Sequence, residues 1–145
     1  MIGLLQRVAF SSVVVDGETV GKIEKGLMVL VGVQPEDNEA KAKRLLERII
    51  GYRVFEDNLG KMNLSLKDIQ GGLLLVPQFT LAANTKKGMR PSFTSAAPPQ
   101  KGKILFDYLV HQAKSLHPHV QTGEFGADMK VTLLNDGPVT FWLEV

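Results

Sequence analysis

The chain has 145 residues, of which 44% are hydrophobic and 22% charged, with a formal net charge of +2. These values are typical of a globular protein with one domain, residues 1–145, and the charge is too small to predict nucleic-acid binding by itself. The absence of cysteine excludes disulfides, thiolate metal sites and a cysteine nucleophile. The N-terminal residues lack the features of a signal peptide, and the longest apolar run, 27–33, is far shorter than the roughly 20 residues that cross a bilayer. We therefore expect a cytoplasmic protein that does not enter membranes.

The first third of the chain predicts β-structure. Gln6–Phe10 alternates and Val13–Val15 follows, and the dipeptide Asp16-Gly17 is a strong hairpin signal before Glu18–Ile23. The continuous apolar run Gly26–Val33 is typical of a strand that is buried on both faces.

A helix is predicted next. Pro35 and Asp37 are expected to open it, and Gly51 to end it. Its apolar residues fall at helical spacing on a single face: Ala42, Leu45, Leu46, Ile49 and Ile50.

The second half of the chain predicts a strand at Leu73–Gln78, an irregular loop at Ala82–Gln100 and a second helix. The apolar side of that helix is formed by Leu105, Leu109, Ala113 and Leu116, with Tyr108 beside them. Two C-terminal strands, Met129–Leu134 and Val139–Val145, are predicted to be separated by Asn135-Asp136-Gly137-Pro138. Strands and two main helices in mixed order predict a single layered α/β domain with a mixed sheet.

The common catalytic motifs are absent: there is no G-x-S-x-G, H-E-x-x-H, P-loop or G-x-G-x-x-G. The three histidines, His111, His117 and His119, lie in or just after the second helix. His117 and His119 have the spacing of two metal ligands, but no carboxylate pattern accompanies them, so we interpret them as polar residues at a helix C-terminus. We expect no metal and no cofactor.

Two segments have a possible functional interpretation as well as a structural one. In Val76–Leu81 an apolar strand delivers Gln78 and Thr80 into a loop, which is where sites are commonly built, although a threonine can also simply satisfy loop backbone. Asn135–Thr140 reads by itself as a hairpin turn followed by an edge strand.

Together these segments resemble the paired signatures of the D-aminoacyl-tRNA deacylase family, S-Q-F-T-L and N-x-G-P-V-T. Here they stand as Pro77-Gln78-Phe79-Thr80-Leu81 and Asn135-Asp136-Gly137-Pro138-Val139-Thr140. Further stretches match that family in order along the whole chain: Gln6–Val8, Val20–Ile23, Gly26–Val33, Arg44-Leu45, Tyr52–Phe55, Met62-Asn63 and Gly88–Phe93.

The resemblance implies a hydrolase that removes D-amino acids esterified to tRNA, and that also acts on glycyl-tRNA. It implies a homodimer with partly barrel-like β-sheets in β-β-α layers and a site at the subunit interface. Gly137-Pro138 would be a cis bond that reaches from one subunit into the pocket of the other. There it would reject L-residues by collision, while glycine, without a side chain, would pass.

The same resemblance places the chemistry at Gln78, Phe79 and Thr80. An aminoacyl ester is already activated, so we expect attack by water or assistance from the ribose 2′-hydroxyl, with the oxyanion held by backbone N–H groups near Phe79 and Thr80. The Thr80 hydroxyl is the alternative nucleophile, but no adjacent base is evident. The resemblance also implies supporting roles for Arg7, Asn135, Val139 and Thr140. We expect Arg7 to hold the Gly137-Pro138 segment in place.

We expect tRNA to be the partner, with no DNA partner. The cations Lys86, Lys87 and Arg90 in the long loop, with Lys101 and Lys103 at the start of the second helix, are candidate phosphate contacts, and ordinary surface solubility is the alternative explanation.

Three other functions stay open at this point. Pro77 stands where the motif has serine, and a related branch that clears L-alanine shares this proline but has alanine in place of Phe79. A related deacylase with L-alanine or relaxed specificity is therefore one alternative. A non-catalytic RNA-binding module and a conventional serine or threonine esterase are the others.

Overall fold

The computed structural model describes all residues, Met1–Val145. The strands are β1 (Ile2–Val15), β2 (Glu18–Ile23), β3 (Gly26–Gly32), β4 (Phe55–Glu56), β5 (Met62–Leu64), β6 (Gly72–Pro77), β7 (Val120–Thr122) and β8 (Lys130–Glu144). The helices are α1 (Glu39–Gly51), α2 (Leu66–Ile69), the 3-10 turn η1 (Phe79–Ala82) and α3 (Pro99–Leu116). None of these helices is long and apolar enough to cross a membrane.

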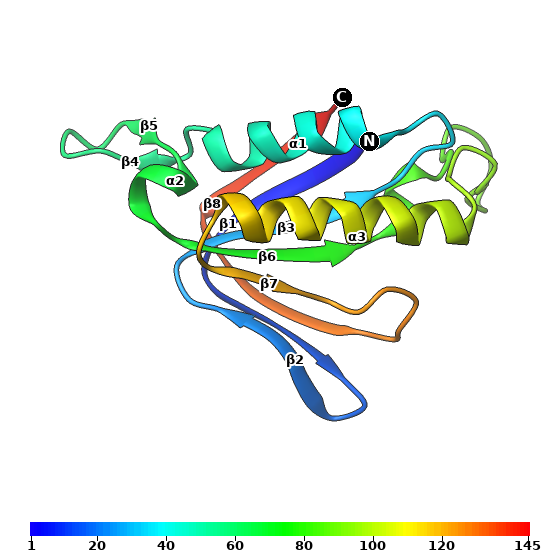
Figure 1. The fold of residues 1–145 in the computed structure, drawn as a ribbon, viewed down its shortest axis with the longest axis horizontal. Coiled ribbons are helices and arrows are strands. Elements are labelled where there is room, and N and C mark those ends of the chain that lie inside the picture. Colours follow the sequence, from blue (N-terminus) through cyan, green and yellow to red (C-terminus); the bar gives the residue numbers. More distant parts are fainter.

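One mixed sheet has the order β2-β1-β3-β6-β7, and β8 pairs with the other edge of β1. The pairs of β1 with β2, β3 and β8 are antiparallel, whereas β3–β6 and β6–β7 are parallel. The strands β4 and β5 form a separate two-stranded sheet beside α2 (Figure 1). The predicted α/β class with a mixed sheet and two main helices is confirmed.

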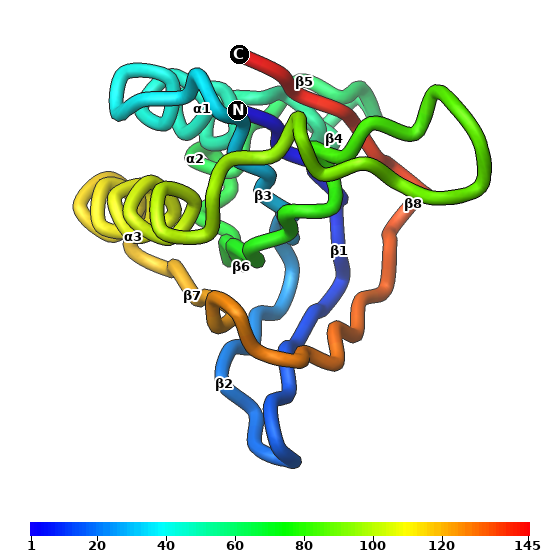
Figure 2. The backbone as a smooth tube through the Cα atoms, turned by 90° about the vertical axis from the view of Figure 1, so that its right-hand side faces the viewer, coloured from blue at the N-terminus to red at the C-terminus, as the bar shows by residue number.

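The main sheet is strongly curved, so its two ends approach each other. A Cβ atom built on Gly21 of β2 would lie 2.5 Å from the carbonyl oxygen of Thr122 in β7, which shows that these two strands touch without a side chain between them. Figure 2 shows β7 passing close above β2 at the narrow end of the molecule. The sheet is therefore partly barrel-like, as the resemblance implies.

The two faces of the sheet carry two apolar clusters. Helices α1 and α3 cover one face (Figure 1), where Leu45 and Leu109 pack with Val29 and Leu75. The other face is the inside of the curve, and its cluster contains Val8, Val13, Ile23, Met28, Leu74 and Val76. Because successive residues of β3 and β6 point into different clusters, both strands are buried on both faces, as their continuous apolar sequences predict.

The predicted hairpin at Asp16-Gly17 is confirmed. Asp16 has φ 49° and Gly17 has φ 79°, so both central residues of the turn lie in the left-handed region that a tight two-residue hairpin requires. The strands that the turn joins, β1 and β2, pair from Val15 opposite Glu18.

The start of α1 differs from the prediction. The helix begins at Glu39, and its N-cap is Asn38, whose Oδ1 accepts a hydrogen bond of 2.9 Å from the N–H of Lys41. Asp37 lies before the helix and is buried. The predicted end at Gly51 is correct.

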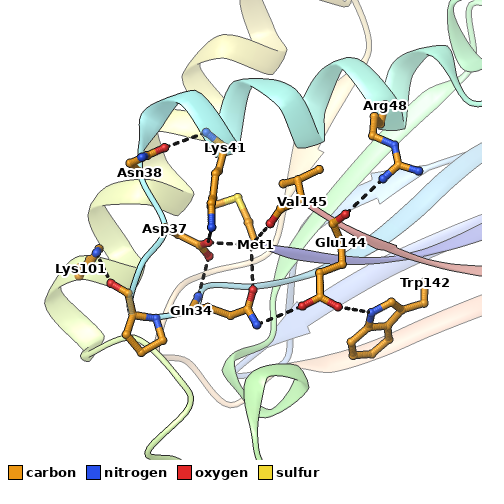
Figure 3. Close-up of polar contacts among 11 residues, drawn as sticks. Met1, Gln34, Asp37, Asn38, Lys41, Arg48, Lys101, Trp142, Glu144 and Val145 are labelled. Carbon is orange, nitrogen blue, oxygen red and sulfur yellow. Dashed lines mark hydrogen bonds and ion pairs between the residues drawn. The ribbon is translucent and has the colours of Figure 1, made fainter.

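Asp37 instead belongs to a polar cluster that joins the two ends of the chain (Figure 3). Its Oδ1 lies 2.7 Å from the N-terminal ammonium of Met1, and its Oδ2 accepts a 2.7 Å hydrogen bond from the N–H of Gln34. The same ammonium donates to Gln34 Oε1 at 2.9 Å and to the carbonyl oxygen of Val145 at 3.0 Å. The side chains of Met1 and Asp37 are both fully buried, so this ion pair is shielded from water.

The C-terminal prediction is wrong in one respect. The residues 135–138 do not separate two strands, because β8 runs through them as one strand of 15 residues. Both halves of β8 pair with β1 in the same antiparallel sense, and the register shifts where Gln6–Ser11 faces Leu133–Thr140. The motif is therefore an irregularity within a strand pair and not a hairpin.

Two further details differ from the sequence prediction. Leu116 is 56% exposed at the end of α3, so it does not share the buried side formed by Leu105, Leu109 and Ala113. His117 follows α3, but its ring is buried and its Nε2 lies 2.6 Å from the carbonyl oxygen of Gly71. The short elements β4, β5, α2 and β7 were not predicted.

Candidate active site

The first predicted site segment leaves the sheet at the end of β6. The N–H of Gln78 still donates to the carbonyl oxygen of Val31 at 2.8 Å, and the chain then turns into η1, which begins at Phe79. The first N–H groups of a helical turn have no partner within that turn. Phe79 and Thr80 are both exposed, so this segment presents backbone donors and two side chains at the surface.

The Thr80 hydroxyl accepts a short hydrogen bond from the Nε2 amide group of Gln78. An amide group cannot remove the proton of a hydroxyl, and no histidine or carboxylate is bonded to Thr80 in the chain. A hydroxyl nucleophile needs a base within hydrogen-bond reach. The local geometry therefore favours the backbone of this turn over the threonine oxygen as the chemically active feature.

The ring of Phe79 packs against the ring of Phe93, a residue that matches the family only as part of the stretch Gly88–Phe93. The ring centroids of Phe79 and Phe93 lie 5.2 Å apart at an interplanar angle of 50°. Both rings are still substantially exposed, 58% for Phe79 and 44% for Phe93. The exposed aromatic surface at this end of β6 is therefore larger than the motif alone suggests.

The second predicted segment lies in the middle of β8. The Gly137-Pro138 bond is cis, and Gly137 has φ +134°. Asn135 holds the two sides of the motif together, because its Oδ1 accepts from the N–H of Val139 at 3.0 Å and its Nδ2 donates to Thr140 Oγ1 at 2.8 Å.

Arg7 of β1 is the main side-chain support of this segment. It is only 8% exposed; its Nε donates to the carbonyl oxygen of Asp136 at 3.0 Å, and its Nη1 donates to that of Val54 at 2.7 Å. The contact with the Asp136 carboxylate, at 3.9 Å, is longer and exposed, and adds little. Arg7 thus ties the residue before Gly137 to the chain that enters β4.

The two segments are far apart within one chain. Gly137-Pro138 lies between Asn135, which pairs with Val8, and Thr140, which pairs with Gln6, so it is level with Arg7. Arg7 pairs with Leu27, and Leu27 with Leu73, so this is the level at which β6 starts. Gln78 follows the end of β6, five residues further along, which corresponds to roughly 16 Å along the strands. The strands β3 and β1 also separate β6 from β8, and Figure 1 shows the end of β6 on the right and the middle of β8 on the left.

One cavity of the chain is lined by neither segment. It has a volume of about 550 Å³ and lies between the β2–β3 turn, the end of α2 and the start of β7, where it is lined by residues such as Lys22, Gln70 and His119. This cavity is therefore separate from the segments that carry the motifs.

The cations predicted to contact tRNA lie in the loop that follows η1. Lys86, Lys87 and Arg90 are exposed, and Met89 between them is fully exposed. Lys101 and Lys103 are engaged elsewhere: the Lys101 ammonium donates to the Pro35 carbonyl oxygen, and Lys103 pairs with Asp107 at 2.6 Å.

The carboxyl groups with a shifted pKa lie outside both segments. Backbone N–H groups of Lys61 and Leu59 lower the pKa of Asp57 in the β4–β5 turn, and hydrogen bonds from Ser65 lower the pKa of Asp68 in α2. Neither residue touches the predicted site, so these shifts report local turn and cap structure.

Comparison with known proteins decides the family. The profile described as D-Tyr-tRNA(Tyr) deacylase matches residues 4–144. A D-aminoacyl-tRNA deacylase of Thioalkalivibrio sulfidiphilus is 67% identical over 145 residues, which is 100% of this chain and 97% of the relative. The chain belongs to the D-Tyr-tRNA(Tyr) deacylase family.

Three further proteins are similar to the chain. The D-aminoacyl-tRNA deacylase of Pseudomonas putida is 62% identical, with both chains covered completely. A solved structure named c-Myc DNA Unwinding Element Binding Protein is 36% identical with a TM-score of 0.96, covering 100% of this chain and 99% of its own. A probable eukaryotic D-amino acid tRNA deacylase, 17% identical, shares the fold with a TM-score of 0.87, covering 99% of this chain and 98% of its own.

Proposed function

We propose that this chain hydrolyses the ester bond of D-aminoacyl-tRNA and releases the D-amino acid and tRNA. The observation that carries the proposal is that both family segments occur in a chain that matches named deacylases from end to end. The start of η1 supports it further, because Phe79 and Thr80 are exposed and the first N–H groups of such a turn have no partner within it. No conventional nucleophile and base accompany them.

In the proposed reaction, a water molecule attacks the ester carbonyl carbon, directly or with help from the neighbouring ribose 2′-hydroxyl. The carbonyl oxygen becomes an oxyanion that accepts hydrogen bonds from the N–H groups near Phe79 and Thr80. The C–O bond to the ribose then breaks, and the departing ribose oxygen takes up a proton. Gln78 orients the Thr80 side chain, and Phe79 lies beside the terminal adenine.

We place the complete site at the interface of a homodimer. In one chain, Gly137-Pro138 is roughly 16 Å along the strands from the level of Gln78, so one chain does not bring the two segments together. A second subunit that brings its Gly137-Pro138 to Gln78–Thr80 would unite the two segments in one pocket. The exposed side chains Leu134, Phe141 and Trp142 of β8 offer apolar surface for such an interface.

The proposed chiral filter follows from that arrangement. Gly137 and Pro138 of the second subunit would face the α-carbon of the substrate, so that a D-side chain points away from them and an L-side chain collides. Arg7, Asn135, Val139 and Thr140 would hold this wall rigid through the bonds described above. Glycine has no side chain to exclude, so glycyl-tRNA is a proposed further substrate. The cytoplasm, where tRNA is charged, is the proposed location.

The experiment that tests D-aminoacyl-tRNA hydrolysis also tests two other possible functions. Relaxed or L-alanine specificity is suggested by Pro77 in the motif. DNA binding is suggested by the name of the relative that is 36% identical. The near-neutral chain, with a net charge of +2, does not favour duplex binding.

The test compares hydrolysis of D-Tyr-tRNA with that of L-Tyr-tRNA and L-Ala-tRNA, at enzyme concentrations far below substrate. We expect turnover of the D-ester alone. Hydrolysis of the L-alanyl ester would move the chain to the related specificity, and binding of tRNA or DNA without any turnover would contradict the enzymatic proposal.

Thr80→Val separates the two possible roles of Thr80. The substitution removes the hydroxyl and keeps the backbone N–H, so we expect the rate to fall by no more than about tenfold, the value of one lost hydrogen bond. Thr80→Ser is the matched control, since it keeps both groups. Complete loss of single-turnover hydrolysis in the valine variant alone would assign the nucleophile to the hydroxyl.

A further inference from the structure

The segment that contains η1 and the following loop has an unusual charge distribution. Residues 69–106 contain five cations and no aspartate or glutamate, whereas the rest of the chain contains 12 cations and 15 acids. Two of the five cations are engaged with other groups of the chain, as described above. The remaining three, Lys86, Lys87 and Arg90, are exposed and make no ion pair, so they are available to a phosphate ligand.

The loop also holds an aromatic ring next to the proposed site. Phe93 packs against Phe79 with a centroid separation of 5.2 Å and keeps 44% of its surface exposed. Reciprocal backbone hydrogen bonds between Asn84 and Ser92, of 2.8 and 3.0 Å, close the loop. Asn84 Oδ1 also accepts from the N–H of Lys86 at 3.0 Å. The three cations therefore lie within a loop whose ends are joined, and Phe93 lies next to one of those ends.

We propose that residues 83–93 bind the unpaired nucleotides that precede the terminal adenosine of tRNA. The inference rests on the proposed function, which places the terminal adenosine at Phe79 and Thr80. One base stacks on the free face of Phe93, and the adjoining phosphates lie against Lys86, Lys87 and Arg90. Single-stranded RNA is recognised by this combination, in which an aromatic side chain takes a base and cations follow the backbone.

The chemistry of the loop fits this ligand better than a protein or duplex partner. A base presents a flat apolar face that matches an exposed phenyl ring, and each phosphate carries one negative charge that meets a loop without acidic residues. The cations are too few to hold a duplex along its length, but they match the short stretch of two or three nucleotides between an acceptor stem and its terminal adenosine.

The experiment compares two substrates that contain the same reacting bond, D-Tyr-tRNA and the D-tyrosyl ester of adenosine, which has no phosphate and no second base. Phe93→Leu keeps an apolar side chain but removes the aromatic face. We expect it to raise KM for D-Tyr-tRNA about tenfold with kcat unchanged, and to leave KM for the adenosine ester unchanged. Phe93→Trp should restore the KM for tRNA.

The combined variant Lys86→Gln, Lys87→Gln, Arg90→Gln tests the phosphate contacts. We expect the slope of log KM against log salt concentration to fall by about 2, since each contact to a single strand contributes about 0.7. Lys43→Gln, Lys67→Gln, Lys114→Gln is the matched control, because it removes three exposed cations elsewhere and should leave the slope unchanged.

An equal increase in KM for both substrates, or no change in KM for either, would overturn the proposal for the loop. An unmodified protein that hydrolyses neither ester would overturn the proposed function itself, so the two failures are distinguishable. Thermal unfolding of each variant identifies any loss that comes from misfolding.

Discussion

Replacing Gly137 by alanine is expected to lower the rate of D-Tyr-tRNA hydrolysis about 100-fold. A Cβ atom at this position would lie 2.7 Å from Val139 Cγ2 and 3.1 Å from Arg7 Nη2, and the φ of +134° is one that residues with a side chain rarely adopt. Val139 is buried and branched, and Arg7 is held by two carbonyl groups, so neither can move freely. The motif itself must shift, and a displacement of about 1 Å at a reacting centre costs about this factor.

The measurement is single-turnover hydrolysis of D-Tyr-tRNA and L-Tyr-tRNA, with thermal unfolding as the check on folding. Gly17→Ala is the matched control. Gly17 also has a positive φ, of +79°, but nothing lies within 4 Å of its added Cβ, and it is in the β1–β2 turn. Gly17→Ala should lose some free energy of unfolding because alanine is strained at a positive φ, but it should keep its activity. A Gly137→Ala protein with full activity and full preference for the D-ester would exclude this residue from the chiral filter.

The second large effect concerns stability. Asp37→Asn keeps the size of the side chain but removes the charge that faces the buried ammonium of Met1 at 2.7 Å. Removing one partner of a buried ion pair leaves the other charge uncompensated, and we expect a loss of about 3 kcal/mol in the free energy of unfolding. This corresponds to a fall of roughly 10 °C in Tm for a domain of this size.

Urea unfolding measures this loss directly. Glu36→Gln is the control, because it neutralises an adjacent acid that is exposed, and we expect its effect to stay within about 0.5 kcal/mol. An Asp37→Asn protein as stable as the control would show that the cluster in Figure 3 contributes packing and not charge pairing.

The sequence by itself determined the elements whose signals are local. The alternating and continuous apolar patterns predicted β1, β3 and β6, the i, i+3, i+4 spacing predicted α1 and α3, and Asp16-Gly17 predicted the hairpin turn. Each of these signals lies within about ten residues, because it reflects backbone preference and side-chain periodicity alone. The full-length resemblance added the family, which the comparisons confirm.

Only the tertiary structure decided the features that depend on partners distant in sequence. Asn135–Thr140 has the composition of a turn, yet hydrogen bonding to β1, more than 120 residues earlier, holds it extended within β8. Asp37 has the composition of a helix start, yet Met1 draws it into a buried ion pair.

The distance between the two site segments was decided in the same way. It follows from the strand registers that link β6, β3, β1 and β8, and no local pattern encodes a register. Sequence patterns report what a residue prefers, whereas long-range hydrogen bonds and buried charges determine which of its allowed conformations is adopted. That is why the sequence indicated the residues of the candidate site, and only the fold showed that a single chain keeps them apart.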